Sequence, residues 1–518
     1  MRARSRRSGA WVHTACLVLA LLVALAGLRA HAQAVRRVEG LPEGLRLSLG
    51  SQLRWEHWAF FDPAPPGGDP DSDFGGGRLR LGLRWERPRL RVEAALQGVQ
   101  LVGLPDDAAG RPGGALGTGA VYFAHAGERH PGALQLRTLN ATLRPFEDRD
   151  LSLTLGRFGY ASGREADSGI PAVEALKARR IADRLVGEFG WSYFQRSFDG
   201  AWLRWSPGPF QVSAAAFSPT EGGFEDGGTR RIDAIDVVAA AITARPGALL
   251  PRTELQAFYL LYDDERRVRA RVDNTGLPAP ERQDLAIHTF GGHAVGVWPV
   301  GAVELDVLGW GAFQTGQWFE LSHRAAAGAL EAGVRVPGWP GSPWLRGGAF
   351  RSRGDGSPRD GRHETFFQVL PTARRYALTP FYNLMNLNDV FVELLVAPTP
   401  ELDVRAAVRD LRLSSGRDLA YAGAGATQAR GTIFGYAGRP AGGDRRLGVA
   451  TELGATWRPA PWLRVHLFYG HVEGGDVVRR HFRDDEDLDF VYLELDVRFE
   501  LAGASDGDAP GPERARDR

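Results

Sequence analysis

The chain has 518 residues and a formal net charge of +1, because its 63 basic and 62 acidic residues nearly balance. This balance excludes an electrostatic nucleic-acid footprint, which needs a net basic surface or stripe. The single cysteine, Cys16, lies near the start of the chain. Disulfides, thiolate metal sites and cysteine nucleophiles are therefore not expected in the mature protein.

Residues 1–32 have the three parts of a secretory signal peptide. A basic start at residues 2–7 precedes an uncharged apolar stretch at 15–28, and Ala30-His31-Ala32 offers a small-x-small cleavage site. The alternative, an uncleaved membrane anchor, fits less well because a spanning helix needs about 20 apolar residues. Removal of the segment with its five arginines and no acid changes the net charge from +1 to −4.

Most of the remaining chain alternates between apolar and polar residues, as strands do when successive side chains face opposite sides. The clearest stretches are residues 45–56, 78–86, 449–458, 463–469 and 489–499. A soluble sandwich and a membrane barrel share this pattern, and alternation alone does not separate them. The secretion signal and the tryptophans near strand ends favour a membrane barrel with interfacial aromatic girdles.

Proline residues divide these strands in a regular way. Proline has no N–H to donate to a sheet ladder, so it marks strand ends. Eight short X-Pro turns alternate with nine mostly longer loops, which is the layout of an outer-membrane barrel with short periplasmic turns and long extracellular loops. The X-Pro pairs are Arg87-Pro88, Arg144-Pro145, Ser206-Pro207, Arg245-Pro246, Trp298-Pro299, Val336-Pro337, Ala397-Pro398 and Arg458-Pro459.

We therefore predict an all-β fold: an antiparallel up-and-down β-barrel of about eighteen strands that spans the bacterial outer membrane. The predicted parts are the signal peptide 1–32, a short periplasmic segment 33–44, the barrel 45–499 and a disordered tail 500–518. Two loops have unusual composition: residues 172–186 have helical composition, and residues 363–389 are apolar, so either could fold into the lumen. The predicted outer loops are 59–77, 102–132, 159–196, 219–235, 262–284, 312–321, 352–388, 412–447 and 474–488.

Several segments resemble the alginate export family of outer-membrane barrels. A Gly-Arg strand end is followed by R-L-x-G, a tryptophan and R-x-F-D-G, and later by F-x-x-L-x-P-T and an asparagine. The chain lacks the Gln-Glu pair expected after Gly156-Arg157, and Arg374 stands where the family tends to have histidine. The matching segments are 155–157, 184–187, Trp191, 196–200, 366–372, Tyr376, Asn386, 410–411, Asp418 and Tyr421.

The resemblance implies an eighteen-stranded pore whose arginine-lined lumen passes an alginate-like polyuronate outward by passive diffusion. Arginine binds carboxylates bidentately, and rings of charged side chains set the ion preference of pores. Arg196 and Asp199 stand out because the family motif contains them, although a structural Arg–Asp pair at a strand start explains them better. The candidates for the substrate pathway are Arg46, Arg54, Arg80, Arg84, Arg157, Arg196, Asp199, Arg204, Arg405, Arg409, Arg458, Arg464 and Arg498.

Other functions stay open at this point. One alternative is a general small-solute porin with slight anion preference, and another is an adhesin-like barrel. A barrel lipase or protease is a further alternative, for which His288, His293 and His323 are candidates by position only. We expect no enzyme activity, cofactor or metal site, although the acidic loop 484–487 could bind divalent cations or bridge them to lipopolysaccharide. The expected partners are an anionic polysaccharide or small anions, outer-membrane lipid and a periplasmic export partner, and we expect a monomer.

Overall fold

The computed structural model describes residues 35–38, 40–63, 68–108, 115–146, 150–483 and 487–503. The predicted signal peptide, residues 484–486 of the acidic loop and residues 504–518 of the predicted tail lie outside this part of the chain. The boundaries predicted there stay predictions.

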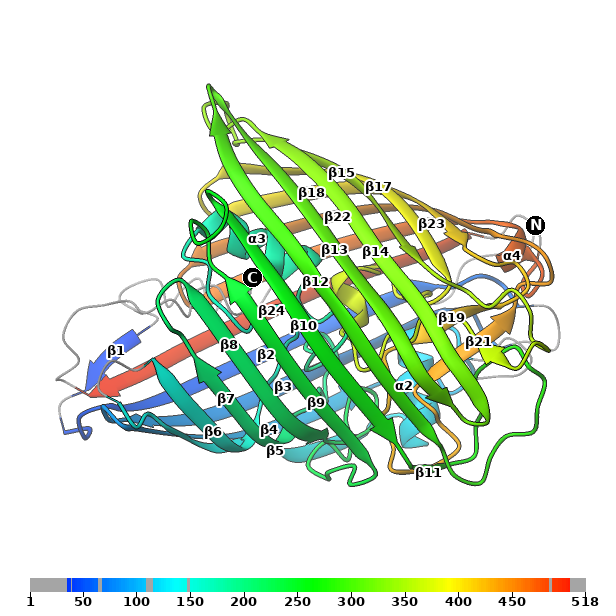
Figure 1. Cartoon of the computed structure of the whole chain (residues 1–518), viewed down its shortest axis with the longest axis horizontal. Coiled ribbons are helices and arrows are strands. Elements are labelled where there is room, and N and C mark those ends of the chain that lie inside the picture. Colours follow the sequence, from blue (N-terminus) through cyan, green and yellow to red (C-terminus); the bar gives the residue numbers. More distant parts are fainter. Residues whose placement is uncertain are drawn as a thin grey trace.

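Within the described residues, eighteen long strands form one closed antiparallel barrel (Figure 1). Each spanning strand pairs with its neighbours along the chain, and the first closes the ring by pairing with the last, from Arg46 opposite Ala502 to Ala59 opposite Asp489. The predicted fold class and strand number are confirmed. The strands are β2 (Leu45–Ala59), β3 (Asp71–Glu86), β4 (Leu90–Val102), β5 (Gly132–Leu143), β6 (Leu151–Phe158), β7 (Phe198–Trp205), β8 (Phe210–Pro219), β9 (Ile235–Ala244), β10 (Thr253–Asp264), β12 (Leu285–Val300), β13 (Val303–Trp318), β14 (Leu321–Arg335), β15 (Trp344–Ser352), β17 (Leu387–Thr399), β18 (Leu402–Leu413), β22 (Arg446–Ala460), β23 (Leu463–Gly474) and β24 (Asp487–Gly503).

The wall has an apolar outer face and a polar inner face. On β3, Leu79 and Leu81 point outward and are 49% and 55% exposed, whereas on β2 the inward Gln52, Arg54 and Glu56 are at most 5% exposed. A water-soluble sandwich would bury the leucines instead. This inverted pattern is typical of a barrel whose outer face contacts lipid.

Three of the eight X-Pro pairs lie inside strand ends rather than in turns, which corrects the prediction. Trp298-Pro299 belongs to β12, Ala397-Pro398 to β17 and Arg458-Pro459 to β22. The pairing register shifts between Val396 and Thr399, and again between Trp457 and Ala460. Both shifts occur where proline cannot donate to the ladder.

Three other predicted boundaries are wrong. Strand β3 begins at Asp71, because the glycines of 75–77 continue the ladder with β2 instead of belonging to a loop. The predicted loop 312–321 shrinks to a tight turn between Trp318 and Leu321, where Phe319 takes a positive φ of 50°. Strand β24 continues past residue 499 to Gly503 and pairs in parallel with a short strand, β1 (Val35–Val38).

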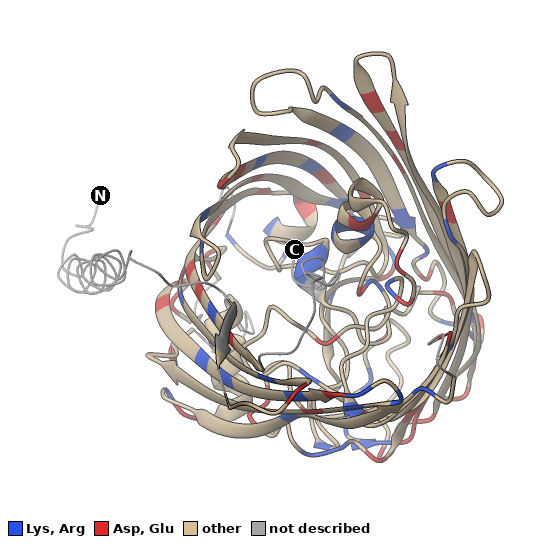
Figure 2. Cartoon of the chain, turned by 90° about the vertical axis from the view of Figure 1, so that its left-hand side faces the viewer, with Lys and Arg blue, Asp and Glu red and all other residues tan. Residues whose placement is uncertain are grey.

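The long loops fold inward and cross the barrel interior (Figure 2). Their buried aromatic and aliphatic side chains form one large cluster with the inner wall, including Tyr193, Phe366, Phe367 and Phe434. No helix of the described residues is long and apolar enough to cross a bilayer. The elements of these loops are α2 (Thr118–Ala126), α3 (Pro171–Arg180), β11 (Arg267–Val268), β16 (Arg362–His363), the 3₁₀ turn η1 (Ala373–Arg375), β19 (Leu419–Gly423), β20 (Arg430–Gly431), β21 (Tyr436–Pro440) and α4 (Asp476–Arg479).

Helix α3 confirms the predicted helical segment within 172–186, although it ends at Arg180. Pro171 at its first turn supplies a φ that suits a helix start. The Nζ atom of Lys177 donates to Glu254 of β10 at 2.9 Å, and the Nε atom of Arg180 donates to Glu331 of β14 at 2.8 Å. Because all four side chains are at most 5% exposed, these ion pairs anchor the helix to the inner wall.

A second contact anchors the loop between β15 and β17. Strand β16 pairs in parallel with the start of β14, and Nδ1 of His363 lies 2.9 Å from Nδ1 of His323. The ring of Trp318 stacks on His363 with 4.0 Å between centroids. This buried histidine pair can share one hydrogen bond only while at least one ring is neutral, so the contact depends on protonation.

Substitution of Lys177 by methionine is expected to detach α3 from the wall. Among the described residues, the buried carboxylate of Glu254 would keep only His293 as a partner, and breaking a buried ion pair costs about 3–5 kcal/mol. Amide hydrogen exchange in residues 171–180 should accelerate, whereas the conservative variant Lys177→Arg should exchange like the wild type. Unchanged protection in Lys177→Met would contradict an anchoring role.

The loop that contains His363 should loosen in acid. Burial lowers the pKa of His363 well below its ordinary value. The released loop therefore takes up a proton that the docked loop rejects, and docking weakens as the pH falls through the ordinary histidine pKa of about 6.5. Hydrogen exchange of residues 353–386, corrected for the pH dependence of the intrinsic amide exchange rate, should rise between pH 7.5 and 5.5. The rise should be smaller in His363→Gln, and an equal rise in both proteins would refute this origin.

Candidate functional site

Most predicted pathway residues lie on the inner face of the wall, and most are already paired. Near the short-turn rim, Arg46 contacts Glu500 at 3.1 Å, Arg84 contacts Glu93 at 2.9 Å and Arg458 contacts Asp403 at 2.6 Å. Arg498 shares their inward register on β24 and is exposed. These arginines therefore combine a charge with a nearby counter-charge. Whether they contact a solute stays a prediction.

Deeper in the barrel, Arg405 and Arg409 of β18 converge on one carboxylate. Glu452 of β22 lies 3.2 Å from Arg405 and 3.4 Å from Arg409. Arg405 also pairs with Glu393, and Arg409 with Asp389. Only Arg405 retains measurable side-chain exposure, 17%, so Arg409 is a buried structural residue in this conformation.

The family motif residues do not pair with each other as expected. Asp199 of β7 accepts two hydrogen bonds of 2.6 Å from Arg157, its direct neighbour on β6. Arg196 instead donates through Nη2 to the carbonyl of Ala424 at 2.6 Å, and its ring neighbour is Phe189. Burial lowers the pKa of Arg196 to about 10, so it stays charged at neutral pH. The predicted Arg196–Asp199 pair is therefore wrong.

Arg204 lies on β7 with its guanidinium 4.4 Å from the ring centroid of Trp202. Arg80 on β3 donates to Gln97 at 2.6 Å and also contacts Gln195 of the inward loop. These partners of Arg204 and Arg80 are neutral side chains.

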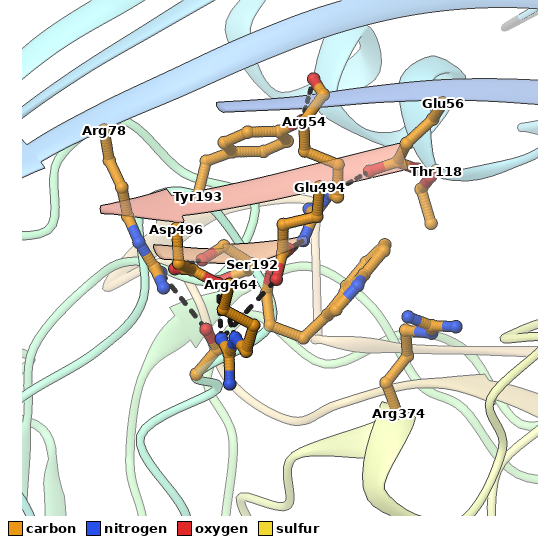
Figure 3. Close-up of polar contacts among 12 residues, drawn as sticks. Arg54, Glu56, Arg78, Thr118, Ser192, Tyr193, Arg374, Arg464, Glu494 and Asp496 are labelled. Atoms are coloured by element: carbon orange, nitrogen blue, oxygen red, sulfur yellow. Dashed lines mark hydrogen bonds and ion pairs between the residues drawn. The ribbon is translucent and has the colours of Figure 1, made fainter. Parts of the chain in front are cut away.

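A group of charged side chains lies where the loop between β6 and β7 meets the wall of β2, β3, β23 and β24 (Figure 3). We call this group the seam. Arg54 donates to Glu56 at 2.8 Å, to Glu494 at 3.1 Å and to the carbonyl of Trp191 at 3.0 Å. Arg464 pairs with Asp496. The contact between Arg54 and the Trp191 carbonyl holds the loop against the wall through a charge-assisted hydrogen bond, and the other contacts join neighbouring strands of the wall.

Two further arginines of the seam were missed by the sequence analysis. Arg78 of β3 donates to the carbonyls of Gly190 and Ser192 at 3.1 and 3.2 Å. Arg374 of the turn η1 donates to the carbonyl of Leu378 at 2.6 Å. Among the described residues neither forms an ion pair with a carboxylate. The alternation on 78–86 placed Arg78 on the polar face, whereas no sequence signal showed that Arg374 reaches the wall.

Arg374 is surrounded by aromatic rings rather than by acids. Its guanidinium lies 4.6 Å from the centroid of Tyr492, 4.7 Å from Phe468 and 5.0 Å from Trp191. Arg54 also contacts this tryptophan: its guanidinium lies 4.2 Å from the centroid of the Trp191 ring. Within the described part of the chain, Arg374 Nη2, Arg54 Nη2 and Trp191 Nε1 have no hydrogen-bond acceptor. The seam thus holds three unused donors.

Four arginines and three carboxylates make up the charges of the seam, so it retains positive charge. The arginines are Arg54, Arg78, Arg374 and Arg464, and the carboxylates are Glu56, Glu494 and Asp496. A carbonyl partner satisfies a guanidinium donor but leaves its net charge in place. A low-dielectric wall strengthens the attraction of such charges for an anion.

The histidines considered for an enzyme are dispersed. His288 contacts the hydroxyl of Tyr259 at 2.8 Å, His293 contacts Glu254 at 3.0 Å, and His323 contacts His363. The described residues contain one group that could hold a metal ion, formed by His57, Asp71 and Asp73 on the outer face of the rim. Its acids are exposed, and exposed acidic groups are common without an ion.

The comparisons with known proteins agree with this architecture. The family model described as alginate export matches residues 176–491. Solved porins of Pseudomonas aeruginosa share the fold: OccK9 (OpdG) has 11% identity, covers 88% of this chain and 98% of its own, and has a TM-score of 0.55. OpdK, solved with vanillate, has 10% identity with the same coverage and a TM-score of 0.52. No curated protein matches the chain.

The family match spans more than half of the chain and includes the second half of α3 and, of the seam charges, Arg374 and Arg464. The structural matches extend the likeness of fold over nearly the whole barrel. The chain therefore belongs to the alginate export family, and it is an outer-membrane β-barrel channel.

Proposed function

We propose that this channel passes an anionic polysaccharide, an alginate-like polyuronate, through its arginine-bearing lumen by passive diffusion. The observation that carries the proposal is the seam, where Arg78 and Arg374 keep their charges without a carboxylate partner. Guanidinium groups bind carboxylates with two parallel hydrogen bonds, which suits a chain that carries one carboxylate on each sugar. The lumen candidates predicted from sequence would continue this route toward the short-turn rim.

The paired arginines suit passage rather than tight binding. Conduction requires that each site attracts the solute but releases it to the next one. An arginine such as Arg464 already contacts Asp496, so an incoming carboxylate would replace one ion pair by another. The net gain in binding free energy is then small. Passive movement down a gradient is consistent with such sites.

The inward loops bear on which anion can pass. A cavity beside α3, lined by Tyr160, Arg184, His293 and Trp310 among others, has about 20 Å³. This is room for about one water molecule. A sugar chain could pass at this place only if the loops moved, and the anchors of α3 are the contacts that would have to break or slide.

The inward loops, which occupy part of the barrel interior, favour a second candidate function, a small-solute porin with slight anion preference. OpdK, one of the structural matches, was solved with vanillate, a small aromatic carboxylate. A solute of that size would need less loop movement than a polymer. An adhesin-like role, the remaining alternative, would leave conductance independent of both solutes.

Single-channel recording of the refolded barrel in a planar bilayer distinguishes these functions. We expect anion selectivity and block by polyguluronate or polymannuronate, but no block by neutral dextran. Arg78→Gln keeps donors for the carbonyls of Gly190 and Ser192 while it removes one charge, so polyuronate block should weaken several-fold.

The matched control is Arg359→Gln, which removes the same charge from an exposed position in the loop between β15 and β16. It should retain the block seen in the wild type. Block by vanillate but not by polyuronate would support the small-solute porin instead. Open conductance that is indifferent to all three solutes would refute both anionic functions.

A further inference from the structure

A groove of about 810 Å³ runs along the outer face of the wall, over β24, β2, β3 and β4. Its sides include Leu53, Trp55, Leu79, Val102 and Leu493, which point outward from the barrel. Leu53, Leu79 and Val102 are 45–53% exposed, so the groove is an open part of the apolar outer surface. Arg54 and Arg78 of the seam lie on the same strands and also contribute to its lining.

Glycines form the floor of this groove. Gly75, Gly77 and Gly98 occupy outward positions, opposite or next to Trp55, Leu53 and Leu79 in the pairing register. A Cβ atom at Gly98 would meet nothing within 4 Å, and one at Gly75 would meet only a backbone oxygen at 3.9 Å. The missing side chains, rather than any bend in the chain, therefore create the depth.

The ladder itself does not require a glycine at positions 75 and 98, whereas a Cβ atom at Gly77 would lie 2.8 Å from Cδ2 of Leu53. The pairing of β2 with β3 is regular along its whole length. Strand β4, the other neighbour of β3, has a register shift only in its pairing with β5, between Ala95 and Leu96. None of the three has a positive φ. Glycine weakens a strand and often marks the close approach of a ligand. An occupant of the groove would account for the open space at Gly75 and Gly98.

We propose that the groove binds an acyl chain of lipopolysaccharide in the outer leaflet. It lies in the half of the wall near the long-loop rim, since β2 ends at Ala59 and β3 begins at Asp71. It is continuous with the apolar face that contacts lipid. An unfilled groove would forfeit dispersion contacts along its lining, and a flexible chain can fill a concave trough.

A second barrel fits the groove less well than a lipid does. Stable protein interfaces bury about 1,200–2,000 Å² and need a matching, well-packed surface. The groove spans only four strands and is concave, while the rest of the outer face offers leucines such as Leu81, Leu330 and Leu345 pointing straight outward. A chain of methylene groups complements this shape, and a wall of protruding leucines does not.

Native mass spectrometry tests the proposal on barrels extracted from outer membranes in a mild detergent. The variants Gly98→Leu and Gly75→Leu fill the groove without meeting a neighbour at Cβ. Gly309→Leu is the matched control, because Gly309 is an outward residue of β13 whose Cβ would also meet open space, far along the chain from the groove. We expect the lipopolysaccharide-bound fraction to fall several-fold in both groove variants and to stay unchanged in the control.

Added lipopolysaccharide supplies a second measurement. Wild-type barrels refolded in phosphatidylethanolamine vesicles should take up lipopolysaccharide with higher apparent affinity than Gly98→Leu barrels, and conductance should be equal in both. Equal retention by all variants would overturn the proposal. So would loss of phospholipid instead of lipopolysaccharide, or a change from dimer to monomer in the groove variants, since these results would assign the groove to a different occupant.

Discussion

The structure depends first on the closure of its hydrogen-bond ladder. In a bilayer every backbone N–H and C=O group must find a partner within the protein, and a sheet with free edges cannot satisfy this condition. The pairing of β2 with β24 removes both edges at once. Once the ring is closed, the alternation of each strand directs leucines to lipid and arginines to the interior. The wall therefore separates two solvents.

The polar interior creates a second requirement, because charges enclosed by a wall need partners. Here the partners come from two sources: carboxylates on neighbouring strands, as for Arg157 and Asp199, and loops that fold inward, as for Lys177 and Glu254. Breaking such pairs leaves a buried charge, so the inward loops are held by the same groups that would attract an anion. Transport and loop anchoring thus compete for one set of arginines.

The strands could be predicted from the sequence because side-chain alternation and proline turns act locally. The prediction failed where a residue carries no side-chain signal: the glycines of 75–77 looked like a loop, although their backbone continues β3. The seam was only partly predictable. Arg54 and Arg464 follow the alternation of their strands, but Arg374 lies in a loop and its aromatic neighbours come from β23, β24 and another loop. Likewise, Arg196 binds the carbonyl of Ala424, a contact that no local pattern encodes.

The short strand β1 has a consequence for the arrangement of the chain. It runs parallel to the last residues of β24, from Val35 opposite Glu500 to Val38 opposite Gly503. The first and last described residues therefore emerge at the same rim, side by side. A peptide tag or fluorescent domain placed directly before residue 35 or directly after residue 503 would be delivered to the same compartment. Energy transfer between two fluorescent labels at these positions would be efficient only in barrels in which β1 has paired with β24. It would therefore provide an optical signal for completed assembly.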